Sequence, residues 1–206
     1  GAATAQAVPT PPVPRVDAPA GSMARRTDGV IRIFKGIPYA LPPVGGRRWQ
    51  APHRMPRWQG TRLAGDFGPA CIQPTVKKPN LYSPDAPPPS SEDCLTLNIW
   101  APADAKNAPV FFWIHGGALT SGSSRDPLYD GKRMAERGVI VVSINYRLGV
   151  LGWLAHPDLS RESPRHVSGN YGLLDQIAAL LWVHDNIGAF GGDARNVTIA
   201  GESAGA

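Results

Sequence analysis

The chain has 206 residues, of which 42% are hydrophobic, and this is enough apolar material to bury a core in one domain. It contains no run of 18 apolar residues, so the sequence predicts no membrane-spanning helix. The formal net charge is +5, but the arginines stand in scattered pairs and form no stripe interleaved with aromatic residues. This arrangement favours a solvated basic surface over a nucleic-acid-binding face.

The first 26 residues are rich in Ala, Pro and Thr, and a segment of this composition cannot pack a core. We therefore predict a loose extended tail over residues 1–26, followed by one domain over residues 27–206. Residues 5–7 read Ala-Gln-Ala, which is the small-x-small form of a signal-peptidase site. The two interpretations are a trimmed signal peptide and an ordinary Ala-rich terminus, and we favour export.

After this tail, predicted strands alternate with predicted helices. Runs of β-branched and apolar residues predict strands over residues 30–34, 95–100, 109–114, 138–144 and 197–199. The continuous apolar runs among them are typical of strands covered on both faces. Residues 127–138 fit a short helix, and apolar residues spaced by three and four over 173–187 predict an amphipathic helix of about five turns. Strands that alternate with helices indicate an α/β sheet.

A long proline-rich stretch over residues 51–91 shows little periodicity. A loop of this length is usually functional or held by a crosslink. Cys71 and Cys94, the two cysteines of the chain, bracket its second half. They are either two unrelated buried thiols or one disulfide, and the loop context favours the disulfide. Two cysteines without paired histidines make a poor metal site, so we predict neither a metal nor another cofactor.

Residues 201–205 read Gly-Glu-Ser-Ala-Gly and directly follow the last predicted strand. In that position the G-x-S-x-G pattern is typical of the nucleophile elbow, in which Ser203 sits at the apex of a strained strand-to-helix turn. Gly201 and Gly205 flank it because a Cβ at either place would collide with the neighbouring strand or helix. A second glycine turn, over residues 115–118, follows another predicted strand and is suited to supply oxyanion-hole N–H groups. The two turns in this order indicate acyl-transfer chemistry.

A serine hydroxyl needs a histidine base, which in turn is oriented by a carboxylate. In this fold both partners follow the nucleophile in the chain, and only three residues follow Ser203. We interpret His184 as a packed residue on the apolar stripe of its helix and His115 as a residue that shapes the glycine turn. The sequence therefore predicts a nucleophile and an oxyanion hole whose base and acid lie beyond this chain.

These turns occur together with other motifs in one known family. From about residue 30 onward, the sequence resembles the type-B carboxylesterase/cholinesterase family. The shared motifs cover residues 34–40 with 42–43, 91–95, 97–100, 113–117, 145–147, 169–176, 182–187, 190–193 and 197–205. The resemblance implies the N-terminal part of an α/β-hydrolase fold, with a mostly parallel central sheet and a small N-terminal antiparallel portion.

The resemblance also implies roles for individual residues. Ser203 would be the nucleophile that forms the acyl-enzyme. The oxyanion hydrogen bonds would come from Gly117, Ala118 and Ala204, and Glu202 would tune the electrostatics of the site. Many relatives have a third glycine where this chain has Ala118, but the alanine N–H still donates.

Two structural features are further implied by the resemblance. The first is the Cys71–Cys94 disulfide, which supports a secreted or periplasmic protein. The second is a set of two buried ion pairs, namely Arg147 with Asp175 and Arg48 with Glu92. Removal of one partner from either pair is expected to destabilise the protein strongly.

The predicted function is a serine carboxylesterase that acts on small-molecule esters without a cofactor. One alternative is a non-catalytic cholinesterase-like adhesion or interaction protein, and another is an inactive truncated product. Adhesion relatives typically lose the nucleophile or its elbow, and both are intact here. The 206-residue chain alone is expected to show no turnover, because the base is missing.

Overall fold

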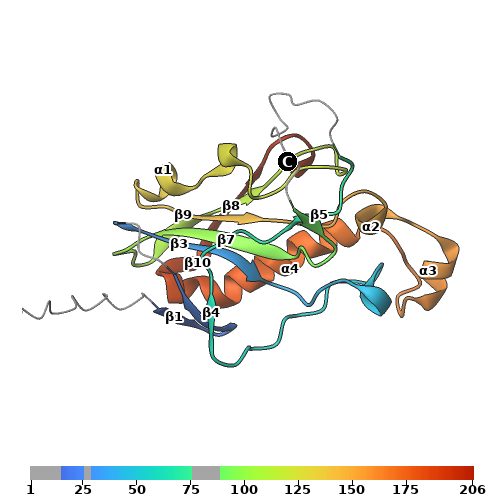
Figure 1. The fold of residues 1–206 in the computed structure, drawn as a ribbon, viewed down its shortest axis with the longest axis horizontal. Helices are drawn as coiled ribbons and strands as arrows, with labels where there is room; N and C mark the ends of the chain where they lie inside the picture. The colour runs from blue at the N-terminus through green and yellow to red at the C-terminus, as the bar shows by residue number, and fades with distance from the viewer. Residues whose placement is uncertain (1–14, 26–28, 76–88) are drawn as a thin grey trace, which may run out of the picture.

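The structure is a computed structural model that describes residues 15–25, 29–75 and 89–206. Residues 1–14, which belong to the predicted tail, lie outside the described residues. The centre is a five-stranded sheet of strand order β10-β8-β9-β7-β3 (Figure 1). Its strands are β3 (Ile31–Pro38), β7 (Thr96–Pro102), β8 (Ala108–Ile114), β9 (Ile140–Ile144) and β10 (Gly192–Gly201).

The sheet has a parallel half and an antiparallel half. β8 pairs in parallel with both β10 and β9, whereas β7 pairs antiparallel with both β9 and β3. Parallel neighbours need a crossover connection, and helical segments occupy the connections from β8 to β9 and from β9 to β10. The predicted α/β class is confirmed, with the antiparallel portion on the N-terminal side.

Helices cover both faces of the sheet (Figure 1). On one face, α1 (Lys132–Ala135) packs its Ala135 against Trp100 and Val141. On the other face, α4 (Tyr171–Asn186) contributes Val183 to the main core. β7 and β9 lie between these layers, and every residue of both strands is buried. The short helix expected over residues 127–138 is split into a 3-10 turn, η2 (Pro127–Tyr129), and α1.

Part of the predicted tail is ordered, so the extent of the predicted tail is wrong. β1 (Arg15–Ala18) and β2 (Gly21–Ala24) form an antiparallel hairpin, and β2 also pairs with β4 (Thr61–Leu63). The Ala20 N–H donates to the Asn186 side chain on α4 at 2.7 Å, and Met23 is fully buried. The hairpin acquires its core from segments distant in sequence, and composition alone does not reveal such contacts.

The helix over residues 173–187 is confirmed, but its predicted buried face is wrong in part: Ile187 is buried and Leu180 packs against the core, whereas the rest of the predicted stripe is exposed. Its apolar stripe of Leu173, Ile177 and Leu181 is 45%, 47% and 60% exposed. His184, which we expected to be packed, is also exposed and bonds only its neighbour Asp185. The face turned to the core consists of Tyr171, Gly172, Asp175, Ala179, Trp182, Val183 and Asn186. On that face, the buried Asp175 interrupts the apolar periodicity. The regular apolar periodicity lies on the exposed stripe, and this misled the prediction.

The remaining elements are short. They are η1 (Gly45–Arg47), β5 (Ala70–Cys71), β6 (Ser90–Ser91), α2 (Gly149–Trp153), α3 (Pro157–Glu162), η3 (Ile187–Phe190) and η4 (Ser203–Gly205).

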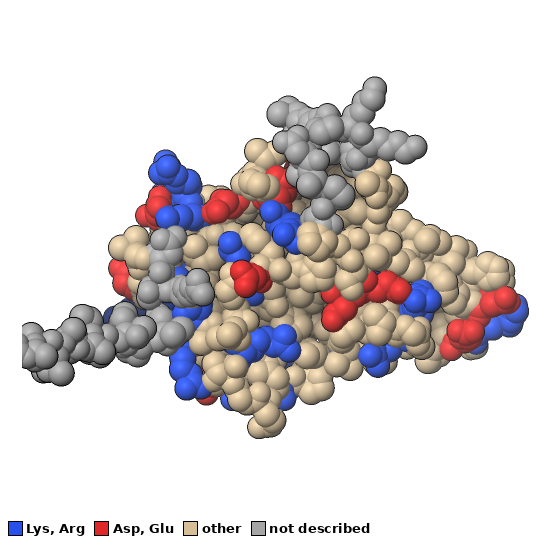
Figure 2. Space-filling view, in the orientation of Figure 1, with Lys and Arg blue, Asp and Glu red and all other residues tan. Residues whose placement is uncertain are grey.

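Within the described ranges, the helices lack the length and apolar character needed to cross a membrane. On the face shown in Figure 2, lysines and arginines are interspersed with aspartates and glutamates, and uncharged surface separates them.

Candidate active site

The two glycine turns leave neighbouring parallel strands at the same edge of the sheet. β8 and β10 pair so that Ile114, the last residue of β8, lies opposite Gly201, the last residue of β10. The chain leaves β8 into residues 115–122, which we call the glycine loop, and leaves β10 into Ser203. Open α/β sheets place their ligands at the carboxyl ends of parallel strands. The topology thus brings the two turns together at the edge where a site is expected.

Ser203 stands at the apex of a sharp turn. Its φ is +54°, in the left-handed region that residues other than glycine rarely adopt. Glu202 before it is still extended, with φ −127° and ψ 140°, and η4 begins at the serine. The change from strand to helical turn takes one residue and leaves Ser203 exposed. The strained backbone predicted from the G-x-S-x-G pattern is therefore confirmed.

The two flanking glycines are required by close backbone contacts. A Cβ on Gly201 would lie 1.9 Å from the Gly205 carbonyl oxygen. A Cβ on Gly205 would lie 2.2 Å from the carbonyl oxygen of Ile114 in β8. Both clashes would be with backbone oxygens, which cannot move aside as the end of a flexible side chain can. Only glycine fits at these two positions, as the sequence predicted.

The glycine loop packs directly against the elbow. A Cβ on Gly116 would lie 3.1 Å from the Ser203 Cβ and 2.6 Å from a carboxylate oxygen of Glu202. Glycine at this position therefore allows the loop backbone to approach both residues. The Ser203 side chain consequently lies against the Gly116 backbone, at the start of the curled part of the loop.

The backbone of the glycine loop is tightly curled. Gly117, Ala118 and Leu119 have φ values of +108°, +54° and +61°. The Gly117 carbonyl accepts the N–H groups of Thr120 and Ser121, both at 3.0 Å. Among the described residues, the N–H groups of Gly117 and Ala118 have no acceptor. Successive N–H groups in such a curled turn form a concavity that suits an anion.

His115 supports the loop from inside the protein. It is 1% exposed, its ring stacks on Tyr146, and its Nδ1 lies 2.8 Å from the Gly116 carbonyl oxygen. That contact requires a proton on Nδ1, which donates to the carbonyl. The Tyr146 hydroxyl in turn donates to the His115 carbonyl at 2.7 Å. Burial lowers the pKa of His115 to about 4, so this ring is neutral at physiological pH.

No described histidine hydrogen-bonds Ser203. The imidazole of His115 is committed to Gly116, and His184 lies at the far end of α4 beside Asp185. The described residues also contain no group of three His, Cys, Asp or Glu side chains arranged to hold a metal ion. The described part of the chain presents a serine and backbone donors, without a proton acceptor for the serine.

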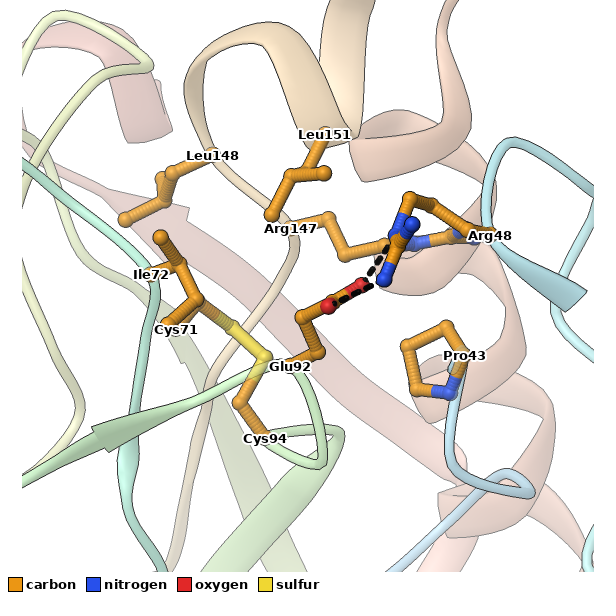
Figure 3. Close-up of a pocket in the computed structure, with 9 residues that line it drawn as sticks. All are labelled: Pro43, Arg48, Cys71, Ile72, Glu92, Cys94, Arg147, Leu148 and Leu151. Carbon is orange, nitrogen blue, oxygen red and sulfur yellow. Dashed lines mark hydrogen bonds and ion pairs between the residues drawn. A yellow bond between two sulfur atoms is a disulfide. The ribbon is translucent and has the colours of Figure 1, made fainter. Parts of the chain in front are cut away.

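Cys71 and Cys94 form a disulfide, with their Cα atoms 5.0 Å apart. The bridge forms one wall of a small pocket that also contains Arg48 and Glu92 (Figure 3). The disulfide expected from the loop context and from the family resemblance is thus present. It joins the end of β5 to the segment that leads into β7.

The two expected ion pairs differ in their surroundings. Arg147 donates from Nε, Nη2 and its backbone N–H to Asp175, at 2.8 to 3.0 Å, and both side chains are buried. The Arg48–Glu92 pair is bidentate at 2.6 Å, but its side chains are 37% and 25% exposed (Figure 3). The expectation of burial is therefore wrong for the second pair, because it lies at the rim of the pocket.

Sequence reasoning gave no role to two residues that contact the glycine loop. Tyr146 lies in the 145–147 motif shared with the family, but nothing in the sequence showed that its hydroxyl reaches the His115 carbonyl. Gln73 hydrogen-bonds Gly122 from the proline-rich stretch, where no periodic pattern singled it out. Both contacts join segments that are far apart in the chain.

Comparisons with known proteins agree with this geometry. A family model described as the carboxylesterase family matches residues 20–206. The fumonisin B1 esterase of Sphingopyxis macrogoltabida is 50% identical over 87% of the chain and 33% of that protein. The para-nitrobenzyl esterase of Bacillus subtilis is 48% identical over 90% of the chain and 37% of that protein. The chain thus spans about a third of the length of these curated relatives.

Solved structures show the same likeness. A PNB esterase structure superposes with a TM-score of 0.84 at 45% identity, over 93% of the chain and 39% of that structure. A carboxylesterase of Geobacillus stearothermophilus gives a TM-score of 0.81 at 47% identity, over 93% of the chain and 38% of that structure. With a family model that covers nearly all of its described residues, the chain belongs to the carboxylesterase family.

Proposed function

We propose that the chain is the part of a serine carboxylesterase that carries the nucleophile and the oxyanion hole. The observation that carries the proposal is the strained backbone of Ser203, held at the end of β10 against Gly116. Ser203 attacks the ester carbonyl, an acyl-enzyme forms with loss of the alcohol, and water then releases the acid. The N–H groups of Gly117, Ala118 and Ala204 stabilise the negative charge on the carbonyl oxygen. Glu202, whose carboxylate lies beside Gly116, adjusts the field at the serine.

The histidine base and its carboxylate then lie beyond Ala206, in a longer polypeptide that we call the parent protein. The relatives extend well past the matched region, which leaves room for both groups. The relatives are named for several different esters, so we propose carboxylic esters of small molecules as the substrate class. The disulfide supports a secreted or periplasmic location, since disulfides persist in oxidising compartments.

Labelling with a fluorophosphonate probe tests the proposal. We expect the folded parent protein to be labelled at Ser203 and to hydrolyse p-nitrophenyl butyrate. The Ser203→Ala variant should lose both properties, whereas Ser160→Ala, which changes an α3 serine, should keep them. The 206-residue chain alone should give no sustained hydrolysis. A folded parent protein that takes up no label would falsify the esterase assignment and favour a non-catalytic interaction protein.

A further inference from the structure

The Gln73 side chain connects the disulfide segment to the glycine loop. Its Oε1 accepts the Gly122 N–H at 2.9 Å, and its Nε2 donates to the Gly122 carbonyl at 2.9 Å. The same Nε2 also donates to the Cys71 carbonyl at 3.1 Å. One amide thus holds both polar groups of a loop residue 49 positions away. Such a paired contact fixes the orientation of Gly122 as well as its distance.

Gly122 in turn is packed onto the first residues of the glycine loop. Its φ is +103°, and a Cβ there would lie 2.5 Å from both the Gly116 carbonyl oxygen and the His115 Nδ1. The loop therefore closes on itself, with its last residue against its first two. Because Gly116 also packs on Ser203, displacement of Gly122 would be transmitted to the donors beside the nucleophile.

The loop needs this external support because its own backbone is strained. Ala118 and Leu119 both have positive φ, and such conformations persist only where the surroundings impose them. Gln73 can impose the strained loop conformation because the backbone that carries it is itself held in place. Cys71, two residues earlier, is 2% exposed and is covalently joined to Cys94, which lies just before the buried strand β7.

We propose that Gln73 is a positioning residue of the esterase reaction, which holds the Gly117 and Ala118 N–H groups in place through Gly122. This inference rests on the proposed function of the glycine loop. It also gives the Cys71–Cys94 disulfide a role in the reaction, since the bridge anchors the segment that carries Gln73. Because Gln73 acts only on the stabilisation of the oxyanion, its loss should lower kcat and leave substrate binding unchanged.

The test compares Gln73→Ala and Gln73→Glu in the parent protein with Gln50→Ala. Gln50 is exposed, and among the described residues its side chain hydrogen-bonds only His53. Glutamate keeps an acceptor for the Gly122 N–H but loses the donors to the Gly122 and Cys71 carbonyls. We expect both Gln73 variants to lower kcat by about 10- to 100-fold with KM little changed, as misplaced donors predict. Gln50→Ala should match the wild type.

A second measurement separates positioning from loss of folded protein. Turnover is expressed per Ser203 labelled after prolonged exposure to a fluorophosphonate, so misfolded molecules do not count. A trifluoromethyl ketone forms an oxyanion adduct with the serine, and its inhibition constant should rise by the factor by which kcat/KM falls. Unchanged kcat and inhibition constant in an active enzyme, or an effect on KM alone, would overturn the role of Gln73. An unlabelled, inactive wild-type protein would instead refute the proposed function.

Discussion

At the scale of single residues, the glycine loop stores strain that its neighbours maintain. A left-handed conformation costs a residue with a Cβ roughly 1–2 kcal/mol, and Ala118 and Leu119 adopt it in succession. The Leu119 carbonyl accepts the Gly149 N–H at 2.7 Å, so the start of α2 secures the middle of the loop. Gly122 secures its end. Ala118 is both strained and the source of an N–H group that we assign to the oxyanion, which fits the tendency of strain to collect at functional sites.

The burial of His115 predicts how the unfolding free energy depends on pH. Burial lowers its folded-state pKa from 6.5 to about 4, so folding favours the neutral ring. The associated stability is fully present above pH 6.5 and is lost as the pH falls from 6.5 to about 4. The loss amounts to about 3 kcal/mol in the free energy of unfolding. Urea unfolding of the parent protein at pH 7 and at pH 4 should show a smaller loss for His115→Gln than for the wild type.

The control for this experiment is His53→Gln, which changes an exposed histidine and should retain the wild-type dependence on pH. Each variant differs from the wild type by one histidine only, so the comparison isolates the contribution of the buried ring of His115. Identical pH dependence in His115→Gln and in the wild type would contradict the inference that the buried ring remains neutral.

At the scale of elements, the Arg147–Asp175 pair fastens α4 to the segment after β9. Asp175→Ala leaves the buried guanidinium of Arg147 without its partner, and we expect a loss of about 3–5 kcal/mol in unfolding free energy. Glu92→Ala removes the partner of Arg48 at a half-exposed position, where we expect a loss of about 1 kcal/mol or less. Chemical denaturation of both variants measures the contrast. Equal losses would show that burial does not distinguish the two pairs.

The elements also show what the sequence can and cannot predict. The elbow was predictable because Gly201, Ser203 and Gly205 are adjacent in sequence and their pattern fixes a local turn. The strands of the central sheet were predictable from runs of β-branched and apolar residues. The buried face of α4 was not, because Asp175 is accommodated by an arginine 28 residues earlier. Gln73 was missed for the same reason, since its partner Gly122 is near only in the folded chain.

At the scale of the whole molecule, two surfaces expose apolar residues that a folded domain normally covers. One is the stripe of Leu173, Ile177 and Leu181 along α4. The other is β10, which ends the strand order of the sheet and leaves Ile199 56% exposed. A continuous apolar stripe on a helix marks an interaction surface. We expect other residues of the parent protein to cover it, as the greater length of the relatives allows.

Coverage of the stripe can be measured by truncation of one of its side chains. Leu181 is 60% exposed here, so its burial in the parent protein would add about 1–2 kcal/mol, and Leu181→Ala should remove that amount from the unfolding free energy. Leu63 on β4 is 83% exposed and stands alone, so Leu63→Ala should cost less than about 0.5 kcal/mol. In the 206-residue chain by itself, where the stripe faces water, Leu181→Ala should approach the small effect of Leu63→Ala. A small effect of Leu181→Ala in the parent protein as well would mean that the stripe remains in contact with solvent there.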